Sequence, residues 1–159
     1  MTANSRTRDR DCVRCGNCCA TYPCALAPDD LEQIAAFLEM NSTEVFRRYL
    51  VLDYAAASGR KMYYVCPARF GDRTGRAVDW DWAFNSSACI FLRGDGCLIE
   101  PVKPRGGRTF SCHQISRTRR NRVIFGKKRA TEAWRGNPML KQLLALAKTQ
   151  PSSTCALPS

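Results

Sequence analysis

The chain has 159 residues, ten cysteines and a formal net charge of +11 at pH 7. A chain of this length is about one domain and can bury roughly two-thirds of the surface that its unfolded form exposes. Ten cysteines are too sparse for a small disulfide scaffold. The first eleven residues are polar and charged, and no later run has the length of a membrane-spanning helix. We therefore expect a cytoplasmic protein with no membrane partner, whose clustered cysteines are metal ligands or redox groups.

Residues 1–11 are expected to form a flexible basic arm that leads into a dense run of cysteines. The segment Cys12-Val13-Arg14-Cys15-Gly16-Asn17-Cys18-Cys19, here called the N-terminal cysteine motif, places four cysteines within eight residues. Two-residue gaps let thiolates converge on one centre, and Gly16 permits the turn that such a loop needs. Cys18 and Cys19 are adjacent and point to opposite sides of an extended segment. One of them ligates a metal, and the other either packs or reaches a second centre.

Two helices are predicted after this motif. Apolar residues recur at helical spacing from Pro28 to Met40, with Pro28 suited to the first turn and Asp29 and Asp30 near the positive end of the helix dipole. Asn41 and Ser42 end this helix and can cap a second one. The second helix carries Val45, Phe46, Tyr49 and Leu50. We expect a helical hairpin whose role is packing.

Residues 60–84 have the pattern of extended structure. The run from Met62 to Val65 is β-prone, and the run from Val78 to Trp82 alternates polar with apolar residues. Glycines between these runs suggest that a hairpin connects them. For Cys24, and for Cys66 with its following proline, ligation and simple packing are both open, and packing is the favoured interpretation.

A second set of cysteines comprises Cys89, Cys97 and Cys112. Between the first two lies Arg93-Gly94-Asp95-Gly96, a strong hairpin signal. We therefore expect Cys89 and Cys97 to lie on neighbouring strands and to face the same site. Cys112 is followed by His113, a further candidate ligand, although a lone histidine is more often a hydrogen-bonded surface or core residue.

These segments resemble a known family. The N-terminal motif, the Cys-x-Phe-Leu segment at Cys89 and the Gly-Cys-Leu-Ile segment at Cys97 are similar to the CxxCxxCC cysteine-cluster family, also called YkgJ-type and described as zinc- or iron-chelating domains. The resemblance spans roughly residues 12–113. It implies a metal-chelating domain whose ligands are Cys12, Cys15, Cys18, Cys19, Cys89, Cys97 and Cys112. The chain departs from the family pattern near Cys112, where no Arg-Pro pair precedes the cysteine.

Positive charge is concentrated in a basic segment, residues 103–135. It holds eleven lysines and arginines and one acid, Glu132, and so carries a net charge of +10. Residues 117–129 could bind an anionic partner, either nucleic acid or an acidic protein, or could form a solvated basic face. A last helix is predicted from Asn137-Pro138 onward, with its apolar stripe formed by Met139, Leu140, Leu143, Leu144 and Ala147. Residues 151–159, which include Cys155, are expected to be a disordered tail.

The identity of the metal stays open between two chemistries. Three closely spaced cysteines with a remote fourth suit an iron–sulfur cluster, and a 4Fe–4S cluster is slightly favoured. Zinc sites more often use two separated Cys-x-x-Cys pairs, but the available thiolates could also fill two zinc sites.

We predict a small single α+β domain, residues 12–150, with a helical hairpin, a short antiparallel sheet region and a C-terminal helix, stapled by a cysteine-ligated metal centre. The predicted function is metal binding, either structural or electron-carrying. An enzyme or accessory subunit that modifies protein or nucleic acid is one alternative, since flagellin lysine methylases carry a similar cysteine pattern. A basic nucleic-acid-binding module is the other. The sequence shows no Gly-rich cofactor loop, Ser/His/Asp arrangement or paired catalytic carboxylates.

Overall fold

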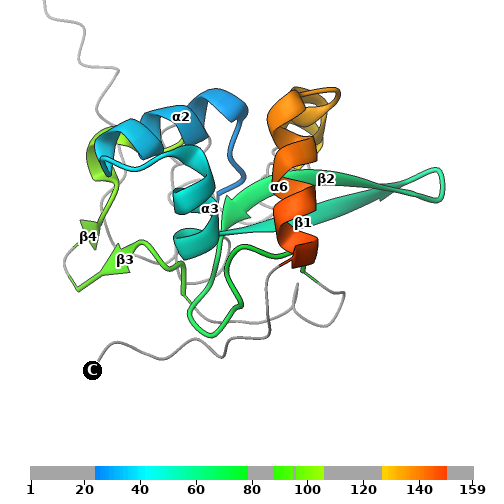
Figure 1. Cartoon of the computed structure of the whole chain (residues 1–159). Helices are drawn as coiled ribbons and strands as arrows, with labels where there is room; N and C mark the ends of the chain where they lie inside the picture. The colour runs from blue at the N-terminus through cyan, green and yellow to red at the C-terminus, as the bar shows by residue number, and fades with distance from the viewer. Residues whose placement is uncertain (1–23, 79–87, 95, 106–126, 150–159) are drawn as a thin grey trace, which may run out of the picture.

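The computed structural model describes residues 24–78, 88–94, 96–105 and 127–149 (Figure 1). Its elements are α2 (Pro28–Phe37), α3 (Ser42–Tyr49), β1 (Leu50–Ala57), β2 (Arg60–Pro67), β3 (Leu92–Arg93), β4 (Gly96–Cys97), the 3₁₀ helix η3 (Glu100–Val102), a helical stretch over residues 127–134, and α6 (Pro138–Thr149). The predicted α+β class, helical hairpin, short antiparallel sheet and C-terminal helix are confirmed. Among these described helices, none has the length and apolar character needed to span a membrane.

The helical hairpin forms because both of its helices are capped at their starts. The Asp30 carboxylate, 6% exposed, accepts the Ala27 N–H at 2.8 Å and also the Arg105 N–H at 3.2 Å, so it ties α2 to the chain that follows η3. At α3, the Asn41 side chain accepts the Glu44 N–H at 2.9 Å and the Glu44 carboxylate accepts the Asn41 N–H at 3.0 Å. This reciprocal pair is the capping box that the polar residues at the junction predict.

The first helix is shorter than predicted. α2 ends at Phe37 rather than Met40, because Glu39 adopts a left-handed backbone with φ of 55°. A non-glycine residue in this region turns the chain and cannot continue a helix. The turn brings Asn41 into place to start α3.

The main sheet is a hairpin of β1 and β2, with Leu50 opposite Pro67 at its root and Ala57 opposite Arg60 at its tip. Ser58 and Gly59 connect the strands, both with positive φ (50° and 73°), as a two-residue turn of the twisted hairpin type requires.

The predicted pairing of the run Met62–Val65, now part of β2, with the run Val78–Trp82 is wrong. β2 pairs with β1, and the segment leading to Val78 instead lies on the other edge of β1, where Ala77 forms a parallel bridge with Leu52. Leu52 accepts the Val78 N–H at 2.8 Å and donates to Arg76 at 2.8 Å. Residues 79–84 of the predicted second strand lie outside the described residues.

A single core joins the helical hairpin, the sheet and the C-terminal part of the chain. The fully buried side chains include Leu26, Leu31, Ile34, Phe46, Leu52, Val65, Trp134 and Leu143. The α6 stripe packs against this core as predicted, with Leu143 at its centre. Trp134 donates its indole N–H to the Leu26 carbonyl at 2.7 Å, so both its ring and its polar group are satisfied in the interior.

Candidate metal centre

Cys89 is held from both sides by backbone hydrogen bonds. It forms an antiparallel bridge with Arg69, and the flanking bonds run from the Phe70 N–H to Ala88 and from the Ile90 N–H to Ala68, each at 2.8 Å. The Cys89 side chain is 8% exposed. The loop after β2 therefore fixes the position of this thiol.

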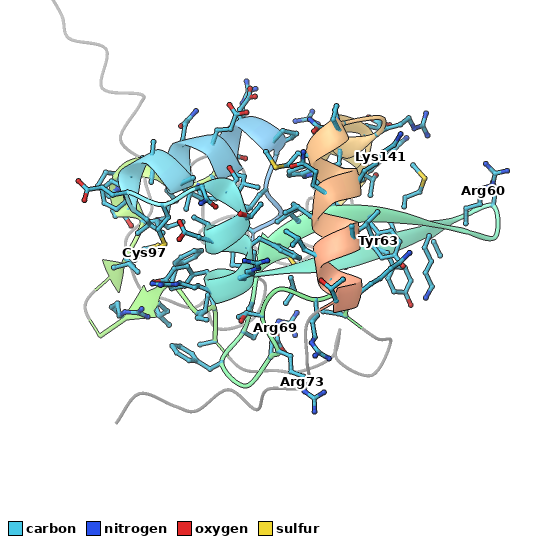
Figure 2. The ribbon with its side chains drawn as sticks, in the orientation of Figure 1. Arg60, Tyr63, Arg69, Arg73, Cys97 and Lys141 are labelled. Carbon is cyan, nitrogen blue, oxygen red and sulfur yellow. The ribbon has the colours of Figure 1, made fainter. Side chains whose placement is uncertain are left out.

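Cys97 is brought to the same neighbourhood by the short β3–β4 hairpin. Leu92 lies opposite Cys97, Arg93 lies opposite Gly96, and the Leu98 N–H donates to the Phe91 carbonyl at 2.8 Å. The hairpin predicted from the Gly-Asp-Gly turn is therefore confirmed. Figure 2 shows Cys97 at the side of the molecule opposite Arg60, which lies at the tip of the β1–β2 hairpin.

Burial is the main cause that raises the pKa of the Cys89 thiol to about 11. The backbone N–H groups of Phe91 and Leu92 and the charge of Arg93 lower this pKa, whereas the nearby Cys97 raises it. The Leu92 N–H donates its hydrogen bond to the Cys89 carbonyl at 2.9 Å. Backbone N–H dipoles and a positive charge near a sulfur favour its anionic form. A bound cation would reverse the effect of burial, because a coordinating thiol loses its proton. The local structure thus suits a thiolate ligand.

Cys89 and Cys97 do not complete a metal site by themselves. Within the described ranges, no group of three or more His, Cys, Asp and Glu side chains could hold a metal ion. The other predicted ligands, Cys12, Cys15, Cys18, Cys19 and Cys112, lie outside the described residues, as do His113 and Cys155. Their ligation stays a prediction.

The surroundings of Cys24 and Cys66 are those of cysteines packed within the fold. The Cys24 thiol lies 3.6 Å from the Ala25 carbonyl and is half-buried. Cys66 is on β2, and burial raises its thiol pKa well above the ordinary range, followed by the effect of the Asp53 carboxylate, while Lys127 lowers it. The charged groups acting on Cys66 therefore come from β1, from the basic segment and from the loop after β2, where Arg69 and Asp72 lie.

A polar group that sequence reasoning missed lies beside Cys66. The Tyr64 hydroxyl, in a side chain 2% exposed, donates to Asp53 at 2.6 Å, and Lys127 Nζ lies 3.6 Å from the same carboxylate oxygen. Burial is the main cause that raises the pKa of Tyr64. No local sequence pattern predicts the contact among Tyr64, Asp53 and Lys127, because Lys127 comes from a distant part of the chain. Lys127 thus has an acidic partner within the protein, and Trp134 of the same segment belongs to the core rather than to a basic face.

Comparison with known proteins adds the family. A sequence model of the CxxCxxCC family, described as "Putative zinc- or iron-chelating domain", matches residues 11–131. The chain belongs to this family. No curated protein and no solved structure matches it. The match covers the N-terminal cysteine motif, both described cysteines of the centre and the start of the helical stretch over residues 127–134, so the CxxCxxCC domain includes most of the described core.

For this CxxCxxCC chain, we expect stability without metal to fall as the pH rises above about 9. The folded Cys89 thiol, with its pKa near 11, still holds a proton that the unfolded chain has released. The protonated Cys89 thiol contributes fully to the free energy of unfolding below its unfolded-state pKa, and this contribution is lost as the pH approaches 11. The total loss is roughly 3 kcal/mol, because the folded-state pKa lies two units above the unfolded-state value. Urea unfolding of reduced, chelator-treated protein at pH 7.5 and pH 10.5 measures this loss.

The matched variant is Cys89→Ala, which removes this thiol while Cys66 and Tyr64, whose pKa values are raised in the same direction, remain. Its stability should fall less steeply over the same pH interval. Identical pH dependence in both proteins would show that Cys89 does not titrate as described.

Proposed function

We propose that this chain is a metal-binding protein that holds a thiolate-ligated centre, with Cys89 and Cys97 as the ligands from the described part of the chain. The cysteines expected to complete the centre are Cys12, Cys15, Cys18, Cys19 and Cys112. The observation that carries this proposal is that the buried Cys89 thiol, fixed by its bridge to Arg69, lies within electrostatic range of Cys97 on the β3–β4 hairpin. Neighbouring cysteine thiolates are the ligands that zinc and iron–sulfur centres use.

The geometry of the β3–β4 hairpin supports the same proposal. Cys97 lies opposite Leu92, whose N–H donates to the Cys89 carbonyl at 2.9 Å, and the two thiols lie close enough for their charges to interact. Two thiolates that repel each other are stabilised together by a shared cation. The fold around them is stabilised in turn, because ligands drawn from distant segments couple metal binding to folding.

We propose a 4Fe–4S cluster as the bound group, with zinc as the alternative. Three closely spaced cysteines of the N-terminal motif and a remote cysteine fit the ligand pattern of a cubane cluster. Such a cluster would supply one-electron transfer when bound. Zinc has no redox chemistry and would make the centre structural.

Anaerobic purification followed by metal analysis and visible spectroscopy tests both levels of the proposal. Iron with acid-labile sulfide and a coloured protein would support the cluster, and stoichiometric zinc in a colourless protein would support the alternative. The matched control is Cys24→Ser, which changes another half-buried cysteine and should keep its metal. Folded wild-type protein with free thiols and neither metal would refute the proposal.

A further inference from the structure

The outer part of the β1–β2 hairpin extends away from the rest of the protein. Residues 55–57 and 60–62, with the turn Ser58–Gly59, form what we call the ribbon tip (Figure 1). Three residues at about 3.3 Å each give it a length of roughly 10 Å beyond the Tyr54–Tyr63 pair. Apart from its chain neighbours, no described atom lies within 4 Å of where a Cβ on Gly59 would lie. Within the part of the chain that the structure describes, the ribbon tip is therefore a free projection.

The ribbon tip is narrow and positively charged. Its first strand carries alanines at positions 55, 56 and 57, and its turn is formed by Ser58 and Gly59. The second strand begins with Arg60 and Lys61, both exposed, and no acid occurs from Tyr54 to Tyr63. Figure 2 shows Arg60 at the far end of the hairpin, away from the rest of the molecule. Small side chains and two cations together make a slim basic element.

Aromatic contacts brace the root of this projection. The rings of Tyr54 and Tyr63 meet edge to face with centroids 6.0 Å apart, and the Lys61 ammonium lies 4.6 Å from the centroid of the Tyr54 ring. One step closer to the protein body, the Tyr64 hydroxyl is bonded to Asp53. These contacts hold the two strands in one register and give the ribbon tip a defined direction.

Further cations stand at the root. Lys127 reaches Asp53, which brings the helical stretch over residues 127–134 against the hairpin. The next two residues on that stretch, Lys128 and Arg129, are exposed. Positive charge therefore lies both at the end of the ribbon and beside its base, so a polyanion could contact both.

We propose that the ribbon tip inserts into the major groove of duplex DNA. That groove is about 12 Å wide and 8.5 Å deep and admits a two-stranded β-ribbon, which matches the length and slimness of the tip. Arg60 and Lys61 would contact phosphates or base edges inside the groove, and Lys128 and Arg129 would contact phosphates at its rim. The major groove of duplex RNA is too narrow to be read in this way. The positive charges would also attract an acidic protein, but binding an acidic protein does not require a narrow projection.

Fluorescence anisotropy of metal-loaded, full-length protein with a labelled DNA duplex of about 30 base pairs tests the proposal. The double variant Arg60→Ala/Lys61→Ala should bind about tenfold more weakly and lower the slope of log affinity against log salt by about two. The matched control is Arg47→Ala/Arg48→Ala on α3, which removes two exposed cations elsewhere. The control should keep most of the affinity.

A shape variant separates groove insertion from general charge attraction. Ala56 is exposed and lies opposite Lys61, so Ala56→Trp thickens the ribbon tip without changing charge or core packing. We expect it to weaken duplex binding about tenfold while unchanged metal content and circular dichroism report an intact fold. Equal losses in the ribbon-tip and α3 double variants, undiminished binding by Ala56→Trp, or equally tight binding of duplex RNA or polyglutamate would each overturn the proposal.

Discussion

Replacing Cys89 with serine should release the bound metal and lower the free energy of unfolding by more than about 4 kcal/mol. Serine keeps the size of the side chain but is a poor ligand for iron or zinc. Metal analysis and thermal unfolding of the purified variant measure the two effects together.

The same result is expected for Cys12→Ser, Cys15→Ser, Cys18→Ser and Cys97→Ser, because each of these cysteines is a proposed ligand. Cys155→Ser should change neither metal content nor melting temperature, and Cys24→Ser is the control within the described residues. Cys24 is half-buried, and its thiol lies 3.6 Å from the carbonyl of the adjacent Ala25. A Cys89 variant that kept its metal, or a Cys155 variant as damaged as the Cys15 variant, would contradict the ligand assignment.

Truncating Trp134 to alanine should cost about 3–5 kcal/mol, the usual range for removing a large aromatic side chain from a core. Trp134 is fully buried and belongs to the same core cluster as Leu26, Phe46 and Leu143. The truncation leaves a cavity at the point where the C-terminal part of the chain joins the helical hairpin and the sheet. Urea unfolding followed by circular dichroism gives the free energy directly.

Two further variants separate the causes of that loss. Trp134→Phe keeps most of the ring volume but removes the donor to the Leu26 carbonyl, and should cost about 1–3 kcal/mol. Phe37→Ala on α2 removes an aromatic side chain that is 41% exposed, and should cost about 1 kcal/mol or less. If Phe37→Ala proved as costly as Trp134→Ala, the assignment of the core would be wrong.

Elements specified by local chemistry could be predicted from the sequence. The start of α3 depends on Asn41 and Glu44, two residues three positions apart whose side chains each accept the other's backbone N–H. The β3–β4 hairpin depends on glycines at its turn, and α6 on Pro138 followed by an apolar stripe. In each case the cause of the structure lies within a few residues of the element.

Features that depend on distant partners could not be predicted. β1 was missed because its first residues continue the apolar pattern of α3, and because its alanine-rich end has weak strand preference. Its identity comes from pairing with β2 and Ala77. Trp134 has charged neighbours in the sequence, so nothing local indicates that it is buried, and its hydrogen-bond partner Leu26 is 108 positions away.

At the candidate metal centre, too, features set by the local sequence could be predicted and features set by distant partners could not. The Gly-Asp-Gly turn was sufficient to place Cys97 near Cys89, because both lie close to one hairpin. The bridge between Arg69 and Cys89, which fixes the thiol from the other side, links segments whose pairing leaves no mark in local composition. The hydrogen bond from the Leu92 N–H to the Cys89 carbonyl follows from the backbone path of a few residues and could not be derived from residue types alone.

The unbroken series α2, α3, β1 and β2 has a consequence for the order of folding. These elements occupy residues 28–67, and they pair with neighbours in the chain, so forming them closes only short loops. The Trp134–Leu26 hydrogen bond instead joins residues 108 positions apart and must form later. A chain that emerges from the ribosome would thus present the segments of both hairpins before its C-terminal part. Metal acquisition at the proposed centre would follow, as a late step of biosynthesis that depends on an already ordered scaffold.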